Sequence, residues 1–177
     1  MLNEVNSPSY EITPLTMAVL VYHDKKGNTG AWVLEEKEEY YIDIPPSKFI
    51  DQACKYYGAS LKGRQEGTRN IYGITHKAPI SIDPSSGMYF FPTASPVNSN
   101  CSWIAHSHIK HVNQLKNKET EVIFRNGRKV SLQVSYGSIM NQIQRTAQFR
   151  YLLDNRLNYS KTQLADRVAE PFLKDLE

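Results

Sequence analysis

The sequence predicts an α+β fold, with β-hairpin-rich sheets, a short helix in the N-terminal half and one long C-terminal helix packed on the sheet. Asn126-Gly127 joins two segments of alternating apolar and polar residues, which is the pattern of a tight β-hairpin. Apolar residues recur at helical spacing over 138–157. Glycine, proline and asparagine divide the first hundred residues into short segments rich in β-forming residues.

The composition is that of one globular domain. The chain has 177 residues, of which 40% are hydrophobic and 22% charged, and this excludes collagen-like and disordered classes. We expect a flexible N-terminus over residues 1–10, a single domain over 11–157 and a C-terminal tail over 158–177. The formal net charge is +3, and the glutamates between 35 and 39 concentrate negative charge, so the rest of the chain is more basic than this total indicates.

The sequence contains neither the pattern of an export signal nor that of a membrane span. Residues 1–10 include Glu4 and no lysine or arginine, unlike a signal peptide. The longest apolar run, Met17 to Tyr22, is far shorter than the roughly twenty residues that cross a bilayer. The two cysteines, Cys54 and Cys101, are expected to be reduced and buried. We therefore expect a cytoplasmic protein with no membrane partner.

The N-terminal half is expected to begin with a hairpin, a third strand and a helix. Segments 15–22 and 31–34 flank the turn sequence Asp24-Lys25-Lys26-Gly27-Asn28, and 40–44 repeats the strand pattern. Pro45-Pro46-Ser47 is typical of a helix start, and apolar residues follow at helical spacing until Gly58. Glycines make 58–68 a structured loop in this interpretation. Short strands are expected at 71–75, 80–82 and 88–91.

The C-terminal half is expected to hold three β-segments, at 103–112, 121–125 and 128–134, and the long helix. Alternation across the last two segments puts valine, leucine and phenylalanine on one face and charged or polar residues on the other. Ser138 is the expected N-cap of a helix that reaches Leu157. The tail from Lys161 contains Pro171, so we expect it to form only a short helix that frays or docks on a partner.

Three groups of basic residues are candidate contacts for a polyanion. Glycines beside Lys55, Lys62, Arg64 and Arg69 allow backbone amides to approach phosphates, although the loop could be purely structural. The turn of the hairpin at Asn126-Gly127 carries the cations Arg125, Arg128 and Lys129. It is narrow enough to enter a DNA groove, and the alternative is a charged turn that only favours solubility. The long helix carries Arg145, Arg150 and Arg156, for which a solvated helix face is the alternative.

A cluster of metal-ligand residue types is the most enzyme-like feature of the chain. It consists of Cys101, His106, His108 and His111. In one continuous strand His106 and His108 share a face, whereas Cys101 and His111 lie on the other. No motif for a zinc site, a nucleophile or a phosphate-binding loop accompanies them. We therefore expect no catalytic site, no cofactor and no bound metal, and a small metal-binding enzyme is kept as an alternative.

A series of short motifs resembles the bacterial ComK family of competence transcription factors. The resemblance extends from about Ser9 to Arg150 and is weakest after Arg156. The matching motifs keep one order along the chain: Cys54-Lys55-Tyr56-Tyr57-Gly58-Ala59-Ser60, Gly63-Arg64, Gly67-Thr68, His76-Lys77-Ala78-Pro79-Ile80, Asp83-Pro84, Phe90-Phe91-Pro92-Thr93, Trp103-Ile104 with His106 and His108, Asn126-Gly127, Ser135-Tyr136, Asn141-Gln142, Arg145-Thr146-Ala147 and Arg150.

The resemblance implies a nucleoid-associated activator of DNA-uptake genes. It implies binding to A/T-rich double-stranded DNA boxes mainly through the minor groove, as a dimer or a multimer of dimers. It also implies RNA polymerase and an adaptor–protease system as partners. The residues that we expect to contact DNA are Lys55, Lys62, Arg64, Arg69, His76, Lys77, Arg125, Arg128, Lys129, Arg145 and Arg150. An adaptor protein without a nucleic-acid role is a further alternative.

Overall fold

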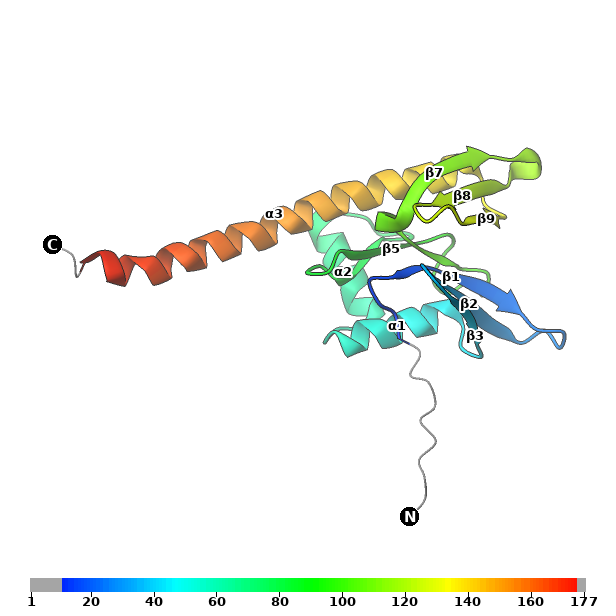
Figure 1. The fold of residues 1–177 in the computed structure, drawn as a ribbon, viewed down its shortest axis with the longest axis horizontal. Helices are drawn as coiled ribbons and strands as arrows, with labels where there is room; N and C mark the ends of the chain where they lie inside the picture. Colours follow the sequence, from blue (N-terminus) through cyan, green and yellow to red (C-terminus); the bar gives the residue numbers. More distant parts are fainter. Residues whose placement is uncertain (1–10, 175–177) are drawn as a thin grey trace, which may run out of the picture.

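The computed structural model describes residues 11–174, with side chains described up to residue 165 (Figure 1). Over this range, two antiparallel sheets and three α-helices form a mixed α+β fold with a long C-terminal helix, which confirms the predicted class. The flexible N-terminus expected over residues 1–10 lies outside the described residues.

The larger sheet has six strands in the order β3-β2-β1-β6-β5-β4. Its first half is the predicted hairpin and third strand, and Asp24 closes the hairpin turn by accepting hydrogen bonds from the backbone N–H groups of Lys26 and Asn28. The strands are β1 Thr16–His23, β2 Thr29–Glu35, β3 Glu39–Ile42, β4 Ile80–Asp83, β5 Met88–Pro92 and β6 Trp103–Ala105.

The smaller sheet has three strands in the order β7-β8-β9, and it contains the hairpin predicted from Asn126-Gly127. Val122 pairs with Val130 across this hairpin, and Gly127 has a φ of 86°, the left-handed conformation that glycine adopts without strain. Buried and solvent-facing positions alternate along both strands, as predicted. The strands are β7 Ile109–Gln114, β8 Thr120–Phe124 and β9 Lys129–Leu132, and a short 3-10 turn, η2 Lys116–Lys118, connects β7 to β8.

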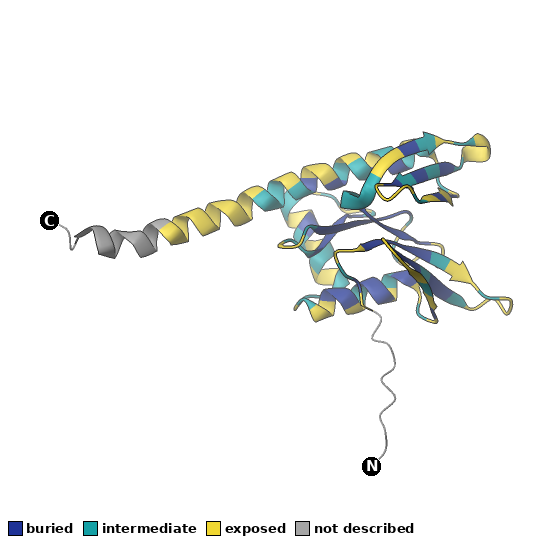
Figure 2. Ribbon diagram, in the orientation of Figure 1, coloured by how far each residue is buried: buried dark blue, intermediate teal, exposed yellow. Residues whose placement is uncertain are grey.

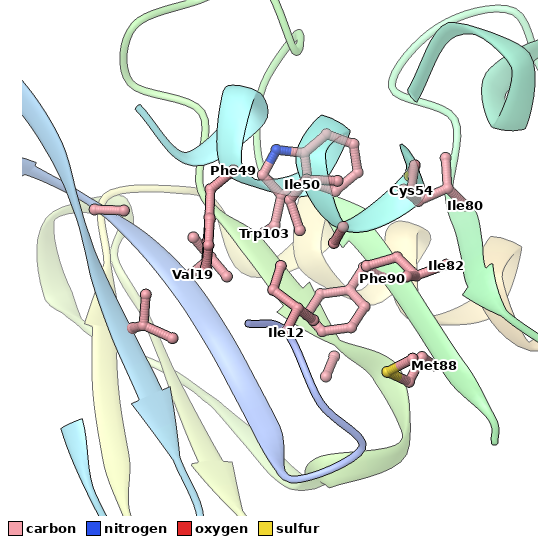
Figure 3. Close-up of a cluster of buried hydrophobic side chains, with 14 of the residues drawn as sticks. Ile12, Val19, Phe49, Ile50, Cys54, Ile80, Ile82, Met88, Phe90 and Trp103 are labelled. Atoms are coloured by element: carbon pink, nitrogen blue, oxygen red, sulfur yellow. The ribbon is translucent and has the colours of Figure 1, made fainter. Parts of the chain in front are cut away.

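Two hydrophobic clusters lie on opposite faces of the larger sheet. Helix α1, Pro46–Tyr56, packs Phe49, Ile50 and Cys54 against one face, where they meet Val19 and Phe90 (Figure 3). On the other face, Ala18, Leu20, Leu34 and Ile104 contact the smaller sheet and the start of the long helix. The molecule is therefore layered: α1, the six-stranded sheet, and then the three-stranded sheet with the C-terminal helix (Figure 1).

The loop predicted over 58–68 and the strand predicted at 71–75 are wrong, because a second helix, α2, occupies Leu61–Tyr72. The Ser60 hydroxyl caps its start by accepting a hydrogen bond from the backbone N–H of Gly63, and Gly73 ends it with a φ of 73°. The buried Thr68 hydroxyl donates to the carbonyl oxygen of Pro79 at 2.6 Å. These tertiary contacts offset the low helix propensity of the internal glycines. The described N-terminal half therefore has two helices, whereas the sequence predicted one.

The strand predicted over 103–112 is also wrong as a single element. A 3-10 turn, η1 His106–His108, separates β6 from β7, and the two strands belong to different sheets. The chain crosses from the larger to the smaller sheet at this turn. Alternation of residue types could not reveal the break, because the strands on either side of it are each β-rich and the turn contains only three residues.

The long helix, α3, spans Tyr136–Lys174 and is longer than predicted at both ends. It begins before Ser138, which is not its N-cap, and the Ser135 hydroxyl accepts the N–H of Ser138 at 3.4 Å. The helix also continues through Lys161 and Pro171, so the separate short tail helix is not observed. Adding a residue to a formed helix requires no new nucleus, which favours continuation. Residues 155–165 are all exposed where α3 extends beyond the body (Figure 2).

Candidate nucleic-acid interface

The basic residues predicted to contact DNA fall into two groups in the structure. The first lies on α1, α2, the α2–β4 connection and α3, and it contains Lys55, Lys62, Arg64, Arg69, His76, Lys77 and Arg145. The second lies at the β8–β9 turn and farther along α3, and it contains Arg125, Arg128, Lys129 and Arg150. Long-range hydrogen bonds and ion pairs hold several of these side chains, so the two groups differ in how many cations are available to a ligand.

Helix α2 presents two cations and uses a third in the fold. Lys62 and Arg69 are exposed, and their spacing places them on one face of the helix, where the Lys62 ammonium also lies 4.0 Å from a carboxylate oxygen of Glu66. The Arg64 guanidinium instead donates to the carbonyl oxygen of Ile82 at 3.0 Å, and its buried Nε has no hydrogen-bond partner among the residues that the structure describes. Arg64 thereby covers a carbonyl of β4, one of the two edge strands of the sheet. Lys55 is exposed but forms an ion pair with Asp51 at 2.7 Å.

Residues of α3 fasten the connection between α2 and β4. The Arg145 guanidinium donates to the carbonyl oxygen of His76 at 2.7 Å and to the side-chain oxygen of Gln142 at 2.9 Å. The Gln142 amide nitrogen donates to the carbonyl oxygens of Lys77 and Pro92 at 3.0 and 2.7 Å. The structure therefore brings His76, Lys77 and Arg145 together, with Arg145 in a positioning role.

The β8–β9 turn docks on the acidic turn between β2 and β3. Arg128 forms an ion pair with Glu39, and the Asn126 amide donates to the carbonyl oxygen of Glu36 at 2.9 Å. Lys129 is exposed on β9. A carboxylate neutralises Arg128, whereas Lys129 and Arg125 are the exposed cations of this turn.

Arg125 and Arg150 come from distant parts of the sequence and line one cleft of about 400 Å³. The Arg125 Nε donates to the carbonyl oxygen of Ser107 at 2.8 Å. The Arg150 guanidinium lies 5.1 Å from the centroid of the Tyr89 ring, and its Nε is 3.6 Å from a carboxylate oxygen of Asp154. Lys110 also lines the cleft, and our sequence analysis missed it. Its only signal there is a cation next to His111 in a β-segment.

The metal-ligand residue types do not converge. The Cys101 thiol is buried against the carbonyl oxygen of Ala94, and His108 contacts the carbonyl oxygen of Pro14 at 2.8 Å. His106 and His111 line the cleft described above. Among the described residues, no three histidine, cysteine, aspartate or glutamate side chains are placed to hold one metal ion.

Both thiols are free and buried. Burial raises the pKa of the Cys54 thiol to about 11 and also raises that of Cys101. Low thiolate content makes both poor nucleophiles at neutral pH. Over the described part of the chain, no helix is both long enough and apolar enough to cross a bilayer.

The fold and these clusters define a mixed α+β binding protein that presents cations on a helix, a turn and a cleft. The family model described as "ComK protein" matches residues 7–158, and the chain belongs to this family. It is 36% identical over 151 residues to the competence transcription factor of Bacillus subtilis (strain 168), covering 85% of this chain and 78% of that relative. No solved structure matches the chain. Membership in this family places the chain among transcription factors and not among enzymes.

Proposed function

We propose that this chain activates competence genes by binding A/T-rich DNA boxes mainly through the minor groove, as a cytoplasmic dimer or multimer of dimers. Family membership carries the proposal, because the matched residues 7–158 include every described strand, both short helices and the packed part of α3. RNA polymerase and an adaptor–protease system are the protein partners in this proposal.

The β8–β9 turn is the element that best suits a minor groove. A/T tracts narrow this groove and deepen its negative potential, which attracts inserted lysine or arginine side chains. Lys129 is exposed beside the three-residue turn Arg125-Asn126-Gly127, in which the Gly127 N–H donates to the carbonyl oxygen of Phe124 at 2.9 Å, and a β-turn of this kind is narrow. The segment 58–68 no longer supports this mode of binding, because it is largely helical.

The pair α1 and α2 favours a second mode of recognition. Tyr57-Gly58-Ala59-Ser60 joins the two helices, and Gly58 has a φ of 78°, as in the turn of many helix-turn-helix units. The exposed face of α2 carries Lys62 and Arg69. An α-helix fits the major groove, so in this second mode α2 reads base edges there.

A mobility-shift titration with three versions of a two-box duplex distinguishes the grooves. The versions are the native A/T-rich boxes, the same boxes with I·C replacing A·T, and the same boxes with G·C, all at one salt concentration. An I·C pair changes the major-groove edge but keeps the minor groove close to that of A·T. We expect only the G·C version to lose binding. If the I·C version loses as much affinity as the G·C version, the protein contacts the major groove, and α2 rather than the β8–β9 turn is the element that recognises the bases. If the protein binds none of the three duplexes, the proposed function is refuted.

The exposed segment of α3 supports self-association. Leu157 and Leu164 are 38% and 64% exposed, and their spacing of one heptad places them on the same face. A second copy of the chain could cover this face by helix pairing. Sedimentation equilibrium should then give a mass above that of one chain in the absence of DNA, and a monomer at all concentrations would contradict association through α3.

A further inference from the structure

The cleft between β7 and α3 has one sign of charge. Its lining includes Lys110 and His111 from β7, Arg125 from the end of β8 and Arg150 from α3, and no acidic side chain of the described residues lines it. Asp154 is the carboxylate that contacts Arg150, and it also accepts a hydrogen bond from the Tyr89 hydroxyl at 2.8 Å. Three cations against this one carboxylate leave the cleft electropositive.

Both arginines are held in place while much of each guanidinium stays available. Arg125 uses Nε for its hydrogen bond to Ser107, and its backbone N–H donates to the carbonyl oxygen of His108 at 2.8 Å. Arg150 is held by the Tyr89 ring and by Asp154, and about a third of its side chain is exposed. A guanidinium has five N–H donors, so these contacts leave several for a ligand. Two fixed guanidiniums suit an oxyanion with several acceptor oxygens.

His106 also lines this cleft. Its Nδ1 is buried and has no hydrogen-bond partner among the described residues. Burial and then the charge of Arg150 lower the pKa of this imidazole. A buried unpaired nitrogen is unfavourable unless a ligand or water satisfies it. An anion in the cleft would offset the charge of Arg150 and thereby raise the pKa of this imidazole.

We infer that this cleft is a phosphate-binding site that holds the sugar–phosphate backbone of bound DNA, with Lys110 and His111 as contacts that our sequence analysis did not assign to DNA. The inference rests on the proposed function. Arg125 lies beside the β8–β9 turn, so a DNA strand that contacts this turn continues into the cleft. Apolar Met140 and Ile143 also line the cleft and suit the deoxyribose between phosphates. Backbone contacts of this kind orient a protein on DNA without reading its sequence.

The test compares Lys110→Gln/His111→Gln with Lys25→Gln/Lys26→Gln in the full chain. All four side chains are exposed, and the second pair lies at the β1–β2 turn, so it serves as the control. Affinity for native and G·C duplexes is measured over a range of salt concentrations. Loss of one phosphate contact should reduce the salt slope by about 0.9, which is about eightfold in affinity at 0.1 M salt when referred to 1 M. Lys110→Arg/His111→Gln should restore much of this loss.

The control variant should keep a larger share of the wild-type salt slope than the cleft variant does. The cleft variant should lose affinity by the same factor for the native and the G·C duplex, because phosphate contacts do not read the sequence. An unchanged slope for the cleft variant, while the wild type binds DNA, would overturn the inference and leave the proposed function intact. No binding by the wild type would refute the proposed function itself. An equal unfolding midpoint for all variants is required. If the double variant is less stable, Lys110→Gln alone gives the same comparison and should show most of the change in slope.

Two NMR titrations identify the source of the phosphate. The imidazole resonances of His106 and His111 should shift on addition of a short duplex. Inorganic phosphate should shift them only at much higher concentration, because a duplex offers several phosphates at once. Shifts with inorganic phosphate but none with duplex would overturn the inference in favour of a free anion. Shifts with an acidic, apolar peptide but none with duplex would overturn it in favour of a protein partner.

Discussion

Gln142 is a buried polar side chain whose removal should strongly destabilise the protein. It is 3% exposed, and its amide nitrogen donates to the carbonyl oxygens of Lys77 and Pro92. Gln142→Met keeps most of the side-chain volume but leaves both carbonyls without this donor. Each unsatisfied buried group costs about 1–3 kcal/mol, so loss of the donor to both carbonyls should lower the free energy of unfolding by about 2–6 kcal/mol. The loss also frees Arg145 from one of its acceptors.

The measurement is urea unfolding followed by tryptophan fluorescence, to which the fully buried Trp103 contributes together with Trp32. With an m-value of about 2 kcal/mol/M, the midpoint should fall by about 1–3 M. Gln148→Met on the exposed face of the same helix is the control and should change stability by less than about 0.5 kcal/mol. If the two variants have the same midpoint, the hydrogen bonds of Gln142 do not hold the α2–β4 connection to α3.

Two further predictions test the helix α2 and the buried carboxylate. Gly67→Ala should raise the free energy of unfolding by about 0.5–1 kcal/mol, because Gly67 lies inside a helix and an added Cβ meets nothing within 4 Å. Gly30→Ala should lower the free energy of unfolding, because its Cβ would lie 2.5 Å from the Ile42 carbonyl oxygen. Destabilisation by Gly67→Ala in the same urea assay would argue against the helix. Glu35 is buried beside the hydroxyls of Thr13 and Thr16, and burial raises the pKa of its carboxyl above that in the unfolded chain. The wild type therefore loses stability as pH rises through this raised pKa and the carboxyl becomes charged. Glu35→Gln does not ionise, so its stability relative to wild type should increase from acidic to neutral pH. A difference in melting temperature between the two proteins that stays constant over this pH range would contradict the prediction.

The sequence alone was enough to predict the elements whose conformation depends on residues close together in the chain. The Asn126-Gly127 turn, the alternation on both sides of it, and the helix that starts at Pro46 each follow from backbone conformation and side-chain periodicity within a few residues. The succession of family-like motifs by itself indicated the class of protein, and the family match over residues 7–158 confirmed it. Such signals survive in the sequence because they do not depend on distant contacts.

Only the tertiary structure decided where local propensity was overruled and which cations remain available. Helix α2 forms despite its glycines because Thr68 and Arg64 bond to residues on and just before β4. The break at His106–His108 is set by the transfer of the chain from one sheet to the other. Arg128 is paired with Glu39, which lies 89 residues away in the sequence, while Arg125 and Arg150 meet in one cleft. The sequence lists every cation, but long-range packing sets which of them hold the fold and which face a ligand.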